Sequence, residues 1–185
     1  MDDAERLPWD EQLAVDDESF RSQLEYLLER SPFYRAKLAD SDTSDGLAEI
    51  TQLPLTDKDE LRATRTPENP IGAHLCAAPS EIVRIYSTSG TTGAPSYVPL
   101  TAGDLDNWVT GSARSYAASG IAAGHRIAST YNAGPFVAGA ALGAFERLGL
   151  THIPVGTGNT ERLLTAIESL KPEAVVLTPS YAVYL

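Results

Sequence analysis

Hydrophobic residues follow two different periods along this chain, and the change falls near residue 80. Before it, apolar positions recur every three to four residues, as on one face of a helix. Phe20, Leu24, Leu27 and Leu28 share such a face. Either Asp17 or Ser19 is placed to cap the helix that carries them.

Further signals before residue 80 also favour helices. Ser31-Pro32 can end one helix and begin the next, because proline is favoured in a first helical turn. Thr56 and Asp59 have the spacing of a capping box. Loops are expected at 40–46 and 66–72. Residues 1–80 are therefore predicted to form a helical lead-in.

After residue 80, short apolar runs alternate with helical patterns. The predicted strands are 82–86, 96–100, 125–131, 151–155 and 174–177. One helix begins at a Thr101–Asp104 cap and carries Leu105, Trp108, Val109, Ser112 and Tyr116 along one side. Two more are predicted at 135–148 and 159–170. This order is typical of the α/β class, and it predicts right-handed crossovers and a partial doubly wound, largely parallel sheet over residues 81–185.

The helix predicted at 135–148 has unusually small side chains. They are Ala138, Gly139, Ala140, Ala141, Gly143 and Ala144. A glycine inside a helix costs up to about 1 kcal/mol, so close approach of another group is expected to offset that cost. Tight packing on the sheet is one interpretation, and space left for a ligand is the other.

A loop of hydroxyls and glycines between two predicted strands is the strongest candidate for chemistry. It comprises Thr88, Ser89, Gly90, Thr91, Thr92 and Gly93. Glycines bring backbone N–H groups close to a ligand, and hydroxyls add donors suited to phosphoryl oxygens. A plain hairpin connection is the alternative. The loop is not a Walker loop, because Ala94-Pro95 and a strand follow Gly93 in place of Lys-Ser/Thr and a helix.

The order Thr-Ser-Gly-Thr-Thr-Gly-x-Pro, residues 88–95, resembles the phosphate loop of adenylate-forming enzymes. The flanking segments are similar to the phenylacetate–CoA ligase branch of that superfamily. They are residues 31–35, 53–61, 81–85, 100–108 and 177–185. The resemblance covers most of the chain from about Phe20 onward.

The resemblance implies ATP-dependent activation of an aryl carboxylic acid in two half-reactions. The carboxylate attacks the α-phosphorus of Mg·ATP and releases pyrophosphate, and the thiol of coenzyme A then attacks the acyl adenylate. Residues 88–93 would bind the nucleotide, and Tyr131 with Phe136 would line the pocket for the acid. ATP, Mg²⁺ and coenzyme A are the expected cofactors. Neither a catalytic residue nor a metal ligand is assigned in this chain.

Two departures from the family pattern leave alternatives open. Ala94 stands where the family's loop usually has a lysine, and full ligases continue into ribose-binding motifs and a domain with a catalytic lysine. The chain alone is therefore expected to be inactive. It could also belong to an adenylating enzyme that transfers to a carrier protein or a cofactor hydroxyl. The third hypothesis is a truncated interaction module that self-associates through an exposed sheet edge after Leu177.

Charge and composition narrow the choice of partners. Almost all of the formal net charge of −11 comes from residues 1–70, which hold 18 acids and 8 bases. Such a chain repels polyanions, so nucleic-acid binding is not expected. An acidic N-terminus and the lack of a long apolar run favour a cytoplasmic protein without membrane contact. Cys76 is the single cysteine, and the three histidines show no metal-ligand spacing.

Overall fold

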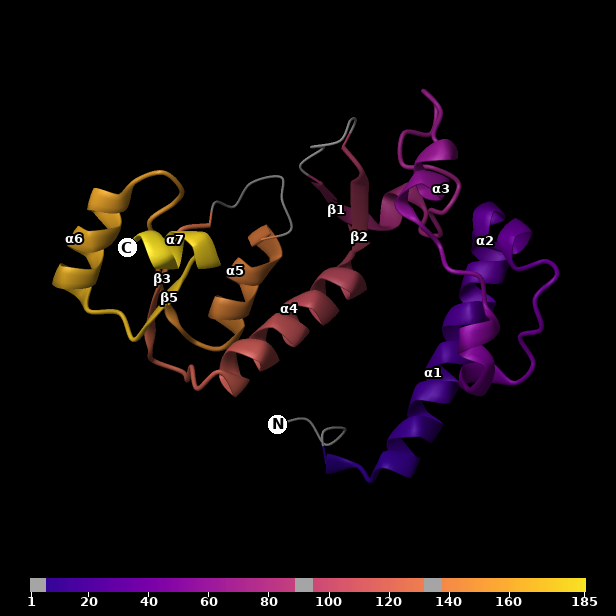
Figure 1. Cartoon of the computed structure of the whole chain (residues 1–185), viewed down its shortest axis with the longest axis horizontal. Coiled ribbons are helices and arrows are strands. Elements are labelled where there is room, and N and C mark those ends of the chain that lie inside the picture. The colour runs from indigo at the N-terminus through magenta and orange to yellow at the C-terminus, as the bar shows by residue number, and fades with distance from the viewer. Residues whose placement is uncertain (1–5, 89–94, 132–137) are drawn as a thin grey trace. The chain divides into compact units, whose positions relative to one another are not determined.

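The computed structural model describes residues 6–88, 95–131 and 138–185. The chain divides into two compact units, Met1–Glu81 and Ile82–Leu185, and each is described by itself. Figure 1 labels their elements. None of the described helices is both long and apolar enough to cross a membrane.

The first unit is helical. Its elements are α1 (Trp9–Arg30), α2 (Pro32–Lys37), the 3₁₀ segment η2 (Gly46–Gln52), α3 (Lys58–Ala63) and the 3₁₀ turn η3 (Pro79–Glu81). Ser31 is fully buried between α1 and α2. Its Oγ accepts a hydrogen bond from Tyr34 N–H at 3.3 Å and donates to Ala73 O at 3.2 Å, so the predicted restart at Ser31-Pro32 is confirmed.

Two predicted helix starts in this unit are wrong. The first helix begins at Trp9, after Pro8, and not at Asp17 or Ser19. Its first turn carries two acids that complement the positive end of the helix dipole. Asp17 lies inside α1 and holds η2 against it, since its carboxylate accepts from Arg21 Nε at 2.6 Å and from Leu47 N–H at 2.7 Å.

The capping box before α3 lies one residue later than the Thr56–Asp59 spacing predicted. Asp57 Oδ1 accepts from Glu60 N–H at 2.8 Å, and Glu60 Oε2 accepts from Asp57 N–H at 2.8 Å. The Glu60 carboxylate also accepts from Lys37 Nζ at 2.5 and 2.7 Å. The hydrogen bonds from Lys37 on α2 favour the capping box that uses Glu60 over the predicted one that uses Asp59.

The second unit contains a two-stranded antiparallel sheet and a three-stranded parallel sheet. Strands β1 (Ile82–Ser87) and β2 (Tyr97–Thr101) form the hairpin. The parallel sheet has the order β4-β3-β5, with β3 (Arg126–Ser129), β4 (Thr151–Pro154) and β5 (Ala174–Val176). The largely parallel α/β sheet predicted from the sequence is confirmed, and its strands are shorter than predicted.

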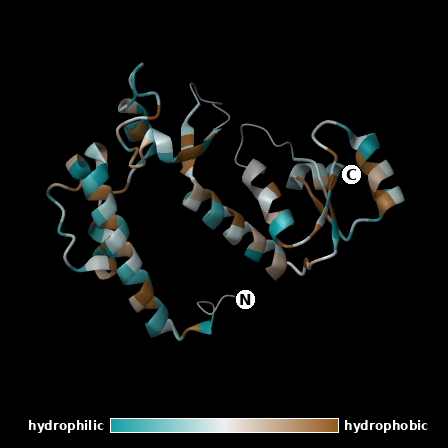
Figure 2. Cartoon of the chain, turned by 180° about the vertical axis from the view of Figure 1, so that it is seen from behind, coloured by the Kyte–Doolittle hydropathy of each residue, from teal (hydrophilic) through white to brown (hydrophobic). Residues whose placement is uncertain are grey.

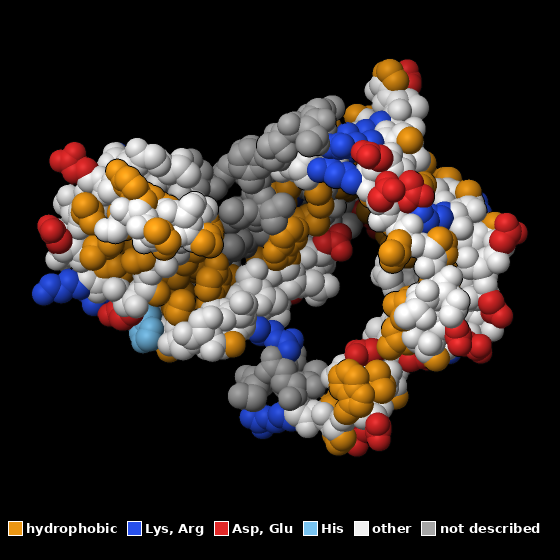
Figure 3. Space-filling view, viewed as in Figure 1, with side chains coloured by type: hydrophobic (Ala, Val, Ile, Leu, Met, Phe, Trp, Pro, Cys, Tyr) orange, Lys and Arg blue, Asp and Glu red, His pale blue; other side chains and the backbone are white. Residues whose placement is uncertain are grey.

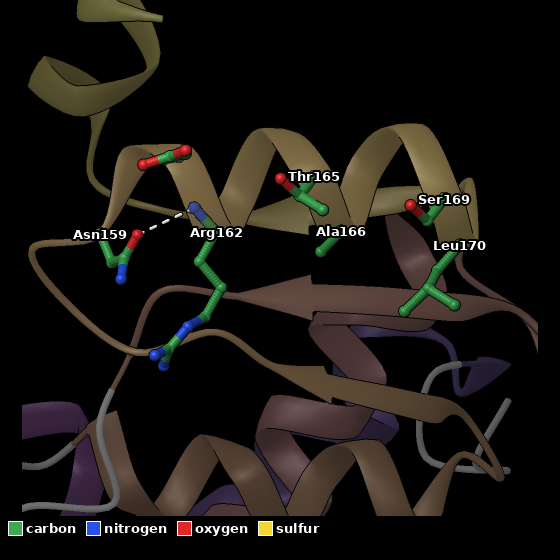
Figure 4. Close-up of a pocket in the computed structure, with 7 residues that line it drawn as sticks. Asn159, Arg162, Thr165, Ala166, Ser169 and Leu170 are labelled. Atoms are coloured by element: carbon green, nitrogen blue, oxygen red, sulfur yellow. Dashed lines mark hydrogen bonds between the residues drawn. The ribbon is translucent and has the colours of Figure 1, made fainter.

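Helices join and cover the strands of this unit. They are α4 (Ala102–Ala118), α5 (Ala138–Arg147), α6 (Thr160–Leu170) and α7 (Pro179–Tyr184). Because the chain runs from β3 to β4 and back past β3 to β5, two crossovers of the same hand place α5 and α6 on opposite faces of the sheet. Figures 1 and 4 show the sheet between these two helices.

The predicted cap of α4 is confirmed. Thr101 N–H donates to Asp104 Oδ2 at 2.9 Å, and Asp104 N–H donates to Thr101 Oγ1 at 3.2 Å. Leu105 and Trp108 on this helix pack on a core of Tyr86 and Leu100 from the hairpin. The apolar stripe predicted for the helix therefore faces the core.

A second core lies under α6. Its buried members are Ala128, Val155 and Leu163, and Tyr181 of α7 packs against them. In Figure 2 the parallel strands carry brown residues beside α6, which has both brown and teal residues. The central strand β3 is buried at three successive residues, 127–129, as expected of a parallel strand whose two faces are both covered by helices.

The small residues of α5 serve packing where the structure describes them. A Cβ added to Gly143 would stand 3.0 Å from Cγ2 of Val109 on α4, and Ala144 is fully buried. Arg147 on the same helix contacts Asp106 and Thr110 of α4. Gly143 therefore allows close packing, but against the helix α4 and not against the sheet as one of the two interpretations expected.

Candidate functional site

The hairpin is closed at its loop end by a pair of hydrogen bonds between Thr88 and Ser96. Thr88 N–H donates to Ser96 O at 2.9 Å, and Ser96 N–H donates to Thr88 Oγ1 at 3.0 Å. The register of β1 and β2 puts these residues opposite each other, one pair beyond Ser87 and Tyr97. Thr88 and Ser96 thus hold together the two ends of the predicted phosphate loop.

Thr88 is the one predicted loop residue that the structure describes. Ser89, Gly90, Thr91, Thr92 and Gly93 lie outside the described residues. The Thr88 hydroxyl oxygen accepts from the Ser96 backbone N–H, and within the part of the chain that the structure describes its own proton has no acceptor. Thr88 therefore lies where the loop begins, and the hydrogen-bonded pair Thr88 and Ser96 is called the neck of the loop below.

Ser96 is a candidate that sequence reasoning missed. Its Oγ is buried and has no hydrogen-bond partner among the described residues. Such a group needs an explanation, because an unsatisfied buried hydroxyl costs about 1–3 kcal/mol. The signal was available in the sequence: extending the hairpin register by one pair places Ser96 opposite Thr88.

Tyr131 follows the carboxyl end of β3, where parallel α/β sheets place ligands. The crossover from β3 leads to β4 on one side, and β5 is the neighbour on the other. Thr130, only 6% exposed, fixes this end of the strand, since its N–H donates to Val176 O at 3.1 Å. Phe136, the other residue predicted for the acid pocket, lies outside the described residues.

Three rings and one hydroxyl form a continuous set of contacts that joins β3, β4, α5 and α4. Ser129 Oγ lies 2.8 Å from His152 Nε2, the His152 ring packs 4.9 Å from that of Phe145, and Phe145 lies 5.1 Å from Tyr116. Burial raises the pKa of Tyr116, and the nearby Tyr131 phenol raises it further. Tyr116, a member of the apolar stripe predicted for α4, ends this set of contacts against Phe145.

His152 is a neutral member of this set of contacts. Burial lowers the pKa of its imidazole, against a smaller opposing effect of Glu146. Ser129 is fully buried, so its hydroxyl is satisfied by the partly buried imidazole of His152. The described residues contain no group of three or more His, Cys, Asp or Glu that could hold a metal ion.

The groove on the flank of α6 is a separate feature. It measures about 530 Å³ and is lined by Asn159, Glu161, Arg162, Thr165, Ala166, Ser169 and Leu170. Figure 4 shows the helix cap beside it, where Arg162 N–H donates to Asn159 Oδ1 at 2.8 Å. The groove contains none of the predicted site residues.

Two crystal structures of a 2-hydroxyisobutyryl-CoA ligase share this fold. The open conformation, in complex with 2-HIB-AMP and CoA, matches with a TM-score of 0.86 and 25% identity over 96% of this chain and 40% of that one. The thioesterification state matches with a TM-score of 0.78 and 28% identity over 92% of this chain and 39% of that one. The fold therefore defines the class of adenylate-forming acid–CoA ligases.

Similar curated proteins indicate the branch of this class to which the chain is related. The chain is 37% identical to a phenylacetate–coenzyme A ligase of Thermus thermophilus over 96% of its own length and 40% of the relative's. It is 36% identical to the phenylacetate–coenzyme A ligase of Aromatoleum evansii over 98% of this chain and 41% of the relative. It is 34% identical to that of Escherichia coli over 100% of this chain and 42% of the relative. No family model matches the chain. The chain belongs to the phenylacetate–CoA ligase branch as an N-terminal portion, and it spans about two fifths of the length of these relatives.

Proposed function

We propose that this chain provides the nucleotide- and acid-binding portion of a ligase that activates an aryl carboxylic acid with ATP and transfers it to coenzyme A. The observation that carries the proposal is the match of nearly the whole chain to phenylacetate–coenzyme A ligases at 34–37% identity. The neck formed by Thr88 and Ser96 supports it, because a hydroxyl- and glycine-rich loop between closed strand ends is suited to phosphates.

The protein's task in the first half-reaction is to position the reactants and to stabilise charge. The carboxylate oxygen of the acid attacks the α-phosphorus of ATP, and the bond to the pyrophosphate oxygen breaks. In the proposal, residues 88–93 donate hydrogen bonds to the departing phosphates, and Tyr131 with Phe136 orients the acid. The chain needs no nucleophile of its own for this step.

Mg²⁺ would enter this scheme together with ATP. Magnesium is commonly bound by substrate phosphates and only one or two protein carboxylates. The lack of a three-residue ligand cluster among the described residues is compatible with that mode. When bound, the ion would offset phosphate charge, and no residue of this chain is assigned to it.

The sequence relatives and the structural neighbour differ in the carboxylic acid that their names state. The sequence relatives are named for phenylacetate, whereas the structural neighbour is a ligase of 2-hydroxyisobutyrate, an aliphatic acid. Tyr131 at the carboxyl end of β3 favours an aromatic acid, because its ring can pack against another. We therefore propose phenylacetate- or benzoate-like acids as substrates.

Calorimetry and a turnover assay test the proposal together. We expect the 185-residue chain to bind Mg·ATP and phenylacetate, and to bind phenylacetate at least tenfold more tightly than 2-hydroxyisobutyrate. Because the chain spans only two fifths of its relatives, we expect almost no pyrophosphate release with ATP, Mg²⁺, CoA and either acid. Absence of nucleotide binding, or tighter binding of the aliphatic acid, would refute the proposal.

A further inference from the structure

The antiparallel hairpin has one covered face, and Thr88 and Ser96 lie at the end of that face. Side chains alternate along a strand, so the register places Ser96 on the side of Leu100 and Thr88 on the side of Tyr86. Tyr86 and Leu100 are buried on this side against α4. Ile85, on the opposite face, is 52% exposed. The Thr88 and Ser96 hydroxyls therefore belong to the covered face, at its loop end.

Both hydroxyls of this pair have protons without an acceptor in the described part of the chain. Thr88 Oγ1 already accepts from Ser96 N–H at 3.0 Å, which leaves its own proton to be donated. Ser96 Oγ is buried and makes no hydrogen bond to any described residue. Both groups therefore need an acceptor, and a negatively charged oxygen is the strongest acceptor for a hydroxyl.

Ser96 carries the first side-chain donor on the chain after Thr92. Gly93, Ala94 and Pro95 have no polar side chain, and the proline also lacks a backbone N–H. Ser96 is therefore the residue that can offer a donor where the chain returns from the loop to β2.

The unit that carries the hairpin is not charged against a phosphate. Residues 82–185 hold six acidic and six basic residues, so the whole formal net charge of −11 belongs to residues 1–81. Figure 3 shows acidic side chains more densely on the elements of the first unit than on those of the second. Neutral hydroxyls of a neutral unit can bind a phosphate whose own charge is partly offset by Mg²⁺.

We propose that the Ser96 hydroxyl, beside that of Thr88, donates a hydrogen bond to a phosphoryl oxygen in the pyrophosphate part of Mg·ATP. The inference rests on the proposed function and deepens it, because it adds to the phosphate site a residue outside loop 88–93. Without nucleotide, the buried hydroxyl is unsatisfied and destabilises the fold. The phosphate relieves this cost when it binds, so Ser96 exchanges stability for affinity.

The carboxylate of the acid is the other anion of the reaction, and it fits this position less well. Tyr131, the residue proposed to orient the acid, follows β3 of the parallel sheet. Ser96 precedes β2 of the antiparallel hairpin, next to the loop whose glycines and hydroxyls suit phosphates. The phosphate is therefore the occupant that both the hydroxyls and their place in the chain favour.

Isothermal calorimetry on the 185-residue chain tests the contact with Mg·ATP, Mg·pyrophosphate and phenylacetate as separate ligands. Ser96→Ala is expected to weaken binding of Mg·ATP and Mg·pyrophosphate by at least about tenfold, because one hydrogen bond to a charged group is lost. Its affinity for phenylacetate should stay within about twofold. Ser96→Thr keeps the hydroxyl and should bind both phosphate ligands within about threefold of the unmodified chain.

Thermal unfolding without ligand supplies a second readout. Because Ser96→Ala removes an unsatisfied buried hydroxyl, its melting temperature should rise by about 2–4 °C although its affinity for Mg·ATP falls. A side chain that only supports the hairpin would lower both quantities when removed. Ser115→Ala, at an exposed position of α4, is the matched control and should leave the affinity for Mg·ATP within about twofold.

Two results would overturn the inference and leave the proposed function standing. They are an unchanged affinity of Ser96→Ala for both phosphate ligands and a melting temperature that falls. A variant that fails to fold counts with the second result, since it shows that the hydroxyl is needed within the fold. Equal weakening of phenylacetate binding would indicate a general distortion and would also contradict the contact. If the unmodified chain binds neither Mg·ATP nor Mg·pyrophosphate, the nucleotide-binding function and this inference fail together.

Discussion

The Thr88 hydroxyl replaces a backbone carbonyl as the acceptor for Ser96 N–H at the neck of the hairpin, with an N···O distance of 3.0 Å. The reverse bond, from Thr88 N–H to Ser96 O, is an ordinary backbone bond of 2.9 Å. A side chain therefore completes the last pair of the ladder, which leaves the Thr88 carbonyl free of this pairing. The chain enters residues 89–94 from this closed pair.

We predict that Thr88→Val loosens the neck and weakens binding of Mg·ATP. Valine has nearly the shape of threonine but leaves Ser96 N–H without its acceptor, which costs about 0.5–1.5 kcal/mol, or up to about tenfold in affinity. Isothermal calorimetry measures the change. Thr88→Ser keeps the acceptor and is the matched control, expected within threefold of the unmodified chain. Unchanged affinity in Thr88→Val would show that the neck does not support the site.

A second prediction concerns the contact between α1 and η2. Gly46 has φ +63°, and a Cβ there would collide with the Asp17 carboxylate and the Arg21 guanidinium. Gly46→Ala is therefore expected to lower the free energy of unfolding by about 1–2 kcal/mol through the left-handed backbone alone, and by more through the displaced ion pair. Urea unfolding of the chain measures it.

The matched control is another glycine-to-alanine change. Gly111 lies inside α4, and an added Cβ there meets no atom within 4 Å. Gly111→Ala is expected to raise the free energy of unfolding by about 0.5–1 kcal/mol, because alanine is the better helix former. Equal effects of the two substitutions would contradict this account of Gly46.

The sequence allowed the core-forming elements of the second unit to be predicted because their periods are strong. The Thr101–Asp104 cap, the stripe beginning at Leu105 and the strand–helix alternation are all found in the structure. The start of α1 was not predictable in this way. Its first turns carry exposed residues, with Trp9 70% exposed, so no buried stripe marks them. The six-residue helix α7 is similarly too short to show a period.

The site was predictable only where neighbours in sequence decide it. The hairpin register is local, and it fixes the position of Thr88 opposite Ser96. The contact between the Tyr116 and Phe145 rings depends on how α4 packs on α5, and the packing of side chains between distant elements leaves no pattern in one sequence. Residues 89–93 and Phe136 stay predictions.

A third prediction concerns the His152–Ser129 pair. Because burial lowers the pKa of His152 below its ordinary value of 6.5, the unfolded chain binds a proton more readily than the folded one. The stability contributed by the neutral imidazole is complete above pH 6.5 and is lost as the pH falls through the folded pKa. His152→Gln keeps a hydrogen-bonding group beside Ser129 but cannot titrate in this range.

Urea unfolding between pH 5 and 8 checks this prediction. We expect the free energy of unfolding of the unmodified chain to fall below pH 6.5 more steeply than that of His152→Gln. The comparison isolates His152 from His74, whose pKa burial and then Arg65 also lower. NMR titration of the His152 ring gives its folded pKa directly. Parallel stability curves for the two proteins would contradict the assignment.

The last prediction concerns Arg126 and Glu173, which join the amino-terminal ends of β3 and β5. Arg126 Nη2 donates to Glu173 Oε1 at 2.9 Å, and Arg126 N–H donates to Glu173 Oε2 at 2.6 Å. The Arg126 side chain and then its backbone N–H lower the pKa of Glu173 from 4.5 to about 2. A lowered carboxylate pKa stabilises the fold above pH 4.5, and this contribution disappears as the pH falls to about 2.

Glu173→Gln removes this pH-dependent contribution, so its free energy of unfolding should fall less steeply than that of the unmodified chain between pH 4.5 and 2. Glu168→Gln, at an exposed position of α6, removes the same charge and is the matched control, expected to retain the steep fall. Because the pair is exposed to solvent, 0.5 M salt should reduce the difference between Glu173→Gln and the unmodified chain. If the control and Glu173→Gln show the same slope, the ion pair does not couple β3 to β5.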